Sequence, residues 1–159
     1  EEPYTLAFES HDFFGASFIS NGGLRILGSD VNTDVLESAI QGCYAEKFLS
    51  PIPDSFRRRY FSSESEKPNS HNQIKTEIQR LIQFRQFNLM SSEYPIATKF
   101  QLIFCRNVLY YLKPERRELL ISKLVDHLEE GGWLVLGITE SGYRIDKMKK
   151  HSISIYQKT

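Results

Sequence analysis

The chain has 159 residues, of which 40% are hydrophobic and 25% charged, enough for a globular domain with its own core. Its 20 basic and 20 acidic side chains give a formal net charge of zero, so overall charge offers no case for binding nucleic acid. No apolar run approaches the roughly 20 residues of a membrane span and no signal-peptide pattern opens the chain, so we expect a cytoplasmic protein without membrane insertion.

The first regular pattern is a short strand followed directly by a helix. Leu24–Asp30 has the pattern of a short strand that ends on a carboxylate. Asn32 or Thr33 can cap a helix whose apolar side chains recur at helical spacing, and Gly42 stands where a C-terminal glycine belongs. The segment therefore predicts a strand and a helix of an α/β fold.

Asp30 ends this strand and has two readings. An acidic residue after the second strand of a nucleotide-binding fold commonly accepts hydrogen bonds from ribose hydroxyls. The alternative is a turn residue that precedes the helix. Strand and helix spacing alone gives the two readings equal weight.

The stretch from Cys43 to Phe87 is less regular. Asp54–Phe61 predicts a short helix with a basic face at Arg57–Arg59, which is more often solvated than a binding site. Ser62–Asn72 is polar and predicts a mobile loop. The apolar positions of Ile74–Ile78 and Leu81–Phe84 predict two short strands that face each other in a hairpin-like insert.

The second half predicts one βαβ unit. Phe100–Cys105 is an apolar strand that ends in a cluster of polar groups, Pro114–Glu129 is helical, and Gly131–Gly137 is a glycine turn feeding a second strand. Ile153–Tyr156 predicts a closing strand near the C-terminus. Open α/β sheets bind ligands at the carboxyl ends of their strands, so the polar cluster after Phe104 marks a candidate site.

The apolar side chains of this second half should form one core. The residues that we expect to pack together are Phe100, Leu102, Ile103, Phe104, Leu119, Leu120, Leu124, Leu128, Trp133, Leu134, Val135, Leu136, Ile153, Ile155 and Tyr156.

The cysteines and histidines give no metal or nucleophile pattern. Neither Cys43 nor Cys105 has a second cysteine or a histidine at metal-ligand spacing, which argues against zinc and against a disulfide framework. We expect Cys105 to be a buried small hydrophobic residue. The four histidines show no triad arrangement and are expected to be structural or solvated.

Six motifs, read in order, resemble the chemotaxis receptor methyltransferases of the CheR type. The resemblance covers essentially the whole chain, and the Cys-Arg-Asn-Val sequence is its most diagnostic part. The motifs are Glu1–Ala7, Gly28–Asn32, Arg59–Phe61, Phe87–Leu89, Phe104–Tyr111 and Gly137–Ser141.

The resemblance implies a doubly wound, Rossmann-like α/β methyltransferase sheet over residues 1–159, with a small antiparallel β insert at about residues 46–84. In some members of the family this insert docks a receptor tail peptide. A short decoration that covers a sheet edge is an equally good interpretation of it here.

The resemblance also implies an activity and site residues. Such enzymes transfer a methyl group from S-adenosylmethionine to glutamate carboxylates on the cytoplasmic region of chemoreceptors, leaving S-adenosylhomocysteine. A glutamate side chain has a pKa near ~4.3, so no general base is needed. The residues carried over are Glu2 near the methionine end of the cofactor, Asp30 at the ribose, Asn88 and Leu89 flanking the adenine, Cys105 and Arg106 on the cofactor floor, and Tyr111 near the transferred methyl.

Two of these residues are the catalytic candidates. Tyr111 could orient the carboxylate or the methyl group through its hydroxyl, and Arg106 could neutralise charge. We expect Asp30, Asn88 and Arg106 to lie on one rim of the sheet, because each follows a predicted strand.

Departures from the family pattern shape further expectations. The chain begins at Glu1 without the family's first strand, glycine loop and helical N-terminal domain, so we expect a fragment with two unpaired strand edges, weak stability and poor cofactor binding. Leu112 replaces a usual aromatic residue and Ile138 a usual histidine. The alternative function is a non-catalytic interaction module. A Rossmann-type dehydrogenase has little support, because no G-x-G-x-x-G stands between a strand and a helix in these residues.

Overall fold

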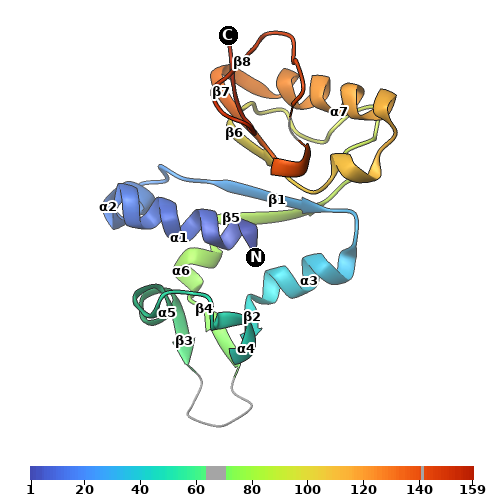
Figure 1. Cartoon of the computed structure of the whole chain (residues 1–159). Helices are drawn as coiled ribbons and strands as arrows, with labels where there is room; N and C mark the ends of the chain where they lie inside the picture. The colour runs from blue at the N-terminus through green and yellow to red at the C-terminus, as the bar shows by residue number, and fades with distance from the viewer. Residues whose placement is uncertain (64–70, 141) are drawn as a thin grey trace. The chain divides into compact units, whose positions relative to one another are not determined.

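The computed structural model describes residues 1–63, 71–140 and 142–159 (Figure 1). The chain forms two compact units, Glu1–Asn88 and Leu89–Thr159. Most of the predicted Ser62–Asn72 loop, residues 64–70, lies outside the described residues, as does Ser141 at the end of the last family motif. No helix in the described ranges is long and apolar enough to cross a bilayer.

Unit 1 combines a pair of parallel strands with a separate small antiparallel sheet. Strands β1 and β5 pair in parallel, and the three-stranded sheet has the order β2-β4-β3. The elements are α1 (Glu2–Phe14), α2 (Ala16–Ser20), β1 (Ile26–Asp30), α3 (Thr33–Gln41), β2 (Cys43–Ala45), α4 (Glu46–Leu49), α5 (Asp54–Tyr60), β3 (Phe61–Ser63), β4 (His71–Ile74), α6 (Thr76–Gln79) and β5 (Ile82–Gln86).

Helix α3 forms as its sequence signals predict. The Asn32 side chain accepts from the backbone N–H groups of Asp34 and Val35, and so caps the first turn. Gly42 ends the helix in the left-handed conformation with φ 62°, which glycine adopts without steric cost. These local signals place the carboxyl end of β1 directly beside a helix start.

Aromatic side chains of α1 build much of the core of unit 1. Tyr4 and Phe8 are buried, and the Phe8 ring stacks on Tyr60 with 4.6 Å between centroids. The Tyr4 hydroxyl donates to the Ala39 carbonyl at 2.7 Å, which ties α1 to α3. The buried residues of this cluster are Tyr4, Ala7, Phe8, Leu49, Tyr60, Phe61, Ile74, Ile78 and Ile82.

A glycine and an aromatic ring face each other in the parallel pair. Gly28 of β1 is the register partner of Phe84 of β5. A Cβ atom on Gly28 would lie 2.7 Å from the Phe84 ring, so the ring occupies the space that a side chain at position 28 would need. Phe84 therefore depends on glycine at its neighbour position.

The predicted hairpin between residues 74 and 84 is wrong. Residues Thr76–Gln79 form the short helix α6, Ile74 ends β4 of the antiparallel sheet, and Ile82–Gln86 pairs in parallel with β1. Alternation of apolar residues identifies a strand but not its partner, and here the partner of β5 lies far upstream. An antiparallel insert is present, but β2, β4 and β3 form it.

Unit 2 is a four-stranded sheet with one long helix. The strand order is β6-β7-β9-β8, with β6 and β7 parallel and β9 antiparallel to both of its neighbours. The elements are β6 (Phe100–Cys105), the 3-10 turn η1 (Leu109–Tyr111), α7 (Pro114–Asp126), β7 (Leu128–Leu136), the 3-10 turn η2 (Ile138–Glu140), β8 (Met148–Lys150) and β9 (Ile155–Lys158) (Figure 1).

The predicted βαβ unit is confirmed, with one change at its glycines. Helix α7 ends at Asp126 and β7 begins at Leu128, before Gly131 and Gly132. The register shifts between Phe100 and Leu102 of β6, so the glycine pair interrupts the β6–β7 ladder as an irregularity inside the strand. A glycine in a strand more often marks such a bulge than the strand's start.

The core of unit 2 lies between α7 and one face of the sheet. Its buried residues are Cys105, Leu109, Leu120, Ile121, Leu124, Val125, Leu128, Leu134, Leu136 and Tyr156. Four residues predicted for this core are exposed instead, namely Leu102, Phe104, Leu119 and Ile153. The first two alternate with Ile103 and Cys105 along β6 and so point to its opposite face, away from the core.

The strand pairings bear on two expectations about the sheet. Asp30 and Asn88 follow strands of unit 1 and Arg106 follows a strand of unit 2, so the expectation that the three residues share one rim stays a prediction. Among the described residues, β1 pairs only with β5 and β6 pairs on one side only, with β7. These are the two strand edges that the sequence predicted to lack a partner. The fold is mixed α/β with parallel strands, as predicted for a Rossmann-like methyltransferase domain.

Candidate functional site

The carboxyl edge of the β1–β5 pair carries two of the predicted residues. Asp30 is the last residue of β1, and its register partner is Gln86, two positions before Asn88. Gln86 Nε2 donates to the Val31 carbonyl at 2.9 Å, which fixes the two chain segments to each other just past the strands. Unit 1 therefore brings Asp30 and Asn88 to the same edge.

The turn reading of Asp30 is confirmed. Asp30 Oδ1 accepts from the Asn32 N–H at 2.9 Å, and this contact shapes the turn that leads into α3. No described residue donates to Oδ2. A carboxylate that uses one oxygen for its own turn still offers the other to a ligand, so the two readings of Asp30 are compatible.

Glu2 and Leu89 lie in different settings. Glu2 occupies the first turn of α1 and is exposed, so its charge favours the helix start. Leu89 opens unit 2, where it packs against the apolar core, and its carbonyl accepts from the Tyr94 hydroxyl. Leu89 is thus held by apolar contacts, while Glu2 faces solvent.

The loop after β6 holds the remaining candidates. Cys105 ends β6, is 4% exposed and pairs in register with Leu136 of β7. Arg106 is exposed directly after it, and Tyr111 on η1 is 82% exposed. The loop therefore presents a cation and a phenol to solvent from a rigid strand end.

Cys105 itself is not a nucleophile. Burial raises the pKa of its thiol to about 12, and the nearby Glu140 carboxylate acts in the same direction. A thiol with such a pKa stays protonated at neutral pH, and only the thiolate is strongly nucleophilic. The prediction of a buried hydrophobic cysteine is confirmed.

Sequence reasoning missed the part that Glu140 plays here. Its carboxylate is 4% exposed and accepts from the backbone N–H of Asn107 at 2.7 Å and of Tyr110 at 2.9 Å. It comes from η2, which lies against η1. Its position shortly after β7, in a family motif, was the available signal, but sequence does not distinguish a buried carboxylate from a solvated one.

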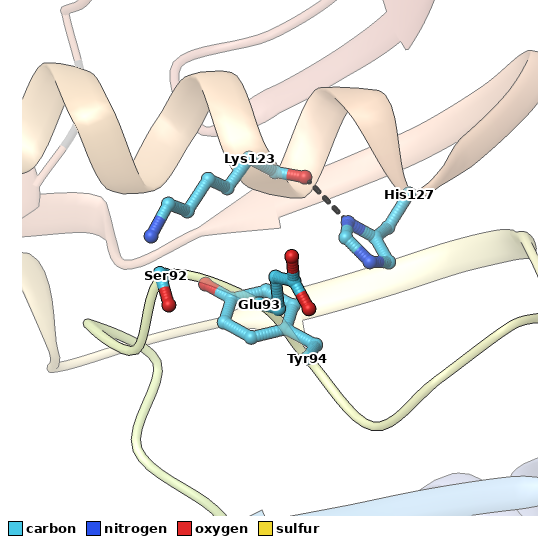
Figure 2. A pocket seen from close by; sticks show the side chains of 5 residues that line it. All are labelled: Ser92, Glu93, Tyr94, Lys123 and His127. Atoms are coloured by element: carbon cyan, nitrogen blue, oxygen red, sulfur yellow. Dashed lines mark hydrogen bonds between the residues drawn. The ribbon is translucent and has the colours of Figure 1, made fainter.

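A pocket of about 290 Å³ in unit 2 lies away from these residues. Figure 2 shows its lining of Ser92, Glu93, Tyr94, Lys123 and His127. Three of these side chains contact backbone carbonyls of unit 2: the Lys123 ammonium donates to the Ser91 carbonyl, His127 Nδ1 lies 2.8 Å from the Lys123 carbonyl, and the Tyr94 hydroxyl donates to the Leu89 carbonyl. The Lys123 contact joins α7 to the loop before β6, and no predicted site residue lines the pocket.

Neither the basic face of α5 nor any cluster of potential metal ligands in the described residues forms a second candidate site. Arg57 pairs with Glu46 and Arg59 pairs with Asp12, so two of the three arginines serve ion pairs. The ranges that the structure describes contain no group of three or more histidine, cysteine or acidic side chains placed to hold a metal ion.

Parallel strands with polar groups at their carboxyl ends define the class of α/β domains that bind nucleotide-like ligands at this edge. Within this class, a family model described as "CheR methyltransferase, SAM binding domain" matches residues 1–157. The chain belongs to this CheR family. S-adenosylmethionine is accordingly the cofactor that its domain is built to bind.

Curated relatives agree with the family model. The chain is 30% identical over 141 residues to a chemotaxis protein methyltransferase of Borreliella burgdorferi, covering 89% of this chain and 48% of the relative. It is 32% identical over 141 residues to one of Vibrio parahaemolyticus (89% and 50%) and 27% identical over 147 residues to one of Escherichia coli K12 (92% and 50%). The chain spans about half the length of the curated relatives it matches.

Proposed function

We propose that this chain is the cofactor-binding part of a protein-glutamate O-methyltransferase that acts on the cytoplasmic region of chemoreceptors. The observation that supports the proposal is the CheR family match over residues 1–157, together with the polar groups that follow β1, β5 and β6. The relatives named chemotaxis protein methyltransferase support the substrate class.

The residues of unit 1 fit parts of S-adenosylmethionine by their chemistry. Ribose hydroxyls are donors, and Asp30 offers a carboxylate oxygen at the end of β1. The Asn88 amide carries both a donor and an acceptor, as the edge of an adenine requires. Glu2, at the first turn of α1, would face the ammonium of the methionine end.

The residues of unit 2 would serve the methyl-transfer step. When bound, S-adenosylmethionine supplies a methyl group activated by its positive sulfur. The glutamate substrate is already ionised at neutral pH, so no residue of this chain has to remove a proton. Tyr111 would orient the carboxylate through its hydroxyl, Arg106 would balance charge, and Leu89 and Cys105 would supply apolar contact.

Substitution of Asp30 tests the cofactor part of the proposal. Asp30→Asn keeps an oxygen that can accept from the Asn32 N–H, and so keeps the turn, but loses the carboxylate charge. We expect the affinity for S-adenosylhomocysteine, measured by calorimetry, to fall about tenfold or more, the effect of a charge-assisted hydrogen bond. The matched control is Asp34→Asn, which removes a charge from the first turn of α3.

The measurement is run on the 159-residue chain and on the product of its complete gene. Binding that depends on Asp30, in either protein, supports the proposal. Absence of binding by both chains would contradict the proposal and favour the non-catalytic interaction module.

A further inference from the structure

Glu140 is a nearly buried carboxylate that holds two points of one loop. Its Oε2 accepts from the Asn107 N–H at 2.7 Å and its Oε1 accepts from the Tyr110 N–H at 2.9 Å. Only 4% of the residue is exposed, so these charge-assisted bonds are shielded from water. One side chain thereby fixes both ends of a short stretch of backbone.

The backbone amides of Asn107 and Tyr110 lie at the two points where the loop takes an unusual or a newly helical conformation. Asn107 has φ 58°, in the left-handed region that residues other than glycine rarely adopt. Tyr110 lies in the first turn of η1, where helical backbone N–H groups lack an intrahelical partner. A charged acceptor at these two points stabilises both the unusual φ and the start of η1.

The neighbouring glycine gives the carboxylate its room. A Cβ atom at Gly137 would lie 2.5 Å from Glu140 Oε2 and 3.3 Å from Asn107 Oδ1. The carboxylate cannot move aside without losing its two hydrogen bonds. The absence of a side chain at Gly137 therefore leaves room for the Glu140 carboxylate, which accepts the two hydrogen bonds.

We propose that Glu140 is a positioning residue that holds the loop of residues 106–111, and with it Arg106 and Tyr111, in a working conformation. The proposal rests on the proposed function, in which Arg106 and Tyr111 serve methyl transfer. Glu140 acts through the backbone of this loop, because each of its two carboxylate oxygens accepts a hydrogen bond from a backbone N–H.

Two variants break the contacts in different ways. Glu140→Gln keeps the size of the side chain but turns an NH₂ group toward one of the two amides, so one hydrogen bond is lost. Gly137→Ala keeps the charge but places a methyl group where Oε2 lies. The control is Glu118→Gln, which removes an exposed carboxylate of α7.

Amide hydrogen exchange measures the loop directly. We expect both the Asn107 and Tyr110 amides in Gly137→Ala, and at least one of them in Glu140→Gln, to exchange about tenfold to a hundredfold faster, as expected for loss of a hydrogen bond to a charged group. The amides of Leu120 and Leu124 in α7 should keep their rates, as should all amides in the control. Unchanged rates at Asn107 and Tyr110, or an equal increase across α7, would overturn the proposal.

A kinetic measurement separates positioning from binding. We expect kcat for receptor methylation to fall about tenfold or more in both variants, while the affinity for S-adenosylhomocysteine changes by less than about threefold. An equal loss in kcat and affinity would overturn the positioning role. If neither the unaltered 159-residue chain nor the product of its complete gene binds S-adenosylhomocysteine or transfers a methyl group, the proposed function fails, and amide exchange still decides whether Glu140 holds the loop.

Discussion

The two cysteines differ in exposure, and this difference predicts their reactivity. Cys43 is exposed, whereas Cys105 is buried with a pKa raised to about 12. The Cys105 thiol therefore stays protonated at pH 8, and only the thiolate reacts readily with alkylating agents. We expect iodoacetamide at pH 8 to label Cys43 alone, as read by peptide mapping. Labelling of Cys105 at the rate of Cys43 in the folded chain would contradict this expectation.

Two neighbouring tyrosines provide a matched test of catalysis. Tyr111 and Tyr110 are 82% and 72% exposed on η1, and only Tyr111 matches the family position near the transferred methyl. We expect Tyr111→Phe to lower kcat about tenfold or more, because the hydroxyl that orients the substrate is lost, with no change in cofactor affinity. Tyr110→Phe should retain full turnover in the same receptor-methylation assay. Equal rates for the two variants would remove the orienting role.

At the scale of elements, a lysine of β9 stabilises the end of α7. Lys158 is 7% exposed, and its ammonium donates to the carbonyls of Val125 and Leu128 at 3.1 and 2.9 Å, with Glu130 at 3.2 Å. A cation at this end of a helix also interacts favourably with the helix dipole. The alternation that buries Tyr156 places Lys158 on the same face, so this position could have been predicted.

Replacing this lysine tests how much the contact contributes. We expect Lys158→Met to lower the free energy of unfolding of unit 2 by about 2 kcal/mol, because the Val125 carbonyl in the last turn of α7 and the Leu128 carbonyl at the start of β7 lose their donor. The control is Lys149→Met on neighbouring β8, an exposed position where little change is expected. Urea denaturation followed by Trp133 fluorescence measures both variants, since Trp133 is the single tryptophan and lies in β7. Equal stability of the two variants would show that the contact contributes nothing.

The sequence predicts an element well when the residues that determine it are close in the chain, and poorly when they are distant. Helix α3 was predicted because Asn32 and Gly42 act locally on its two ends. The partner of β5 was missed because β1 lies far away in the chain, and pairing at that distance leaves no local signal. For the site, Asp30 was found as a strand-end carboxylate, whereas the burial of Glu140 depends on a loop that follows another strand.

At the scale of the whole molecule, each unit has its own core. Ile78 is fully buried in unit 1 and Leu120 is fully buried in unit 2, each within a separate cluster. Separate cores favour separate cooperative transitions.

A single core substitution tests whether the units unfold separately. We expect Ile78→Ala to lower the stability of unit 1 by about 2–5 kcal/mol, through the cavity that it leaves. The urea midpoint seen by Trp133 should stay in place, while the loss of helical circular dichroism begins at lower urea. Leu120→Ala should move the Trp133 midpoint. Equal shifts of the Trp133 midpoint by both substitutions would show that the chain unfolds as one cooperative block.

The facing pair of Gly28 and Phe84 also bears on how this family can evolve. Because the ring of Phe84 fills the space beside Gly28, a larger residue at position 28 requires a smaller one at position 84. We expect a larger residue at position 28 alone to destabilise the β1–β5 pair, and a smaller residue at position 84 to restore the fit. The two positions should therefore covary among homologues. Such covariation would support the parallel pairing of β1 with β5 in those proteins as well.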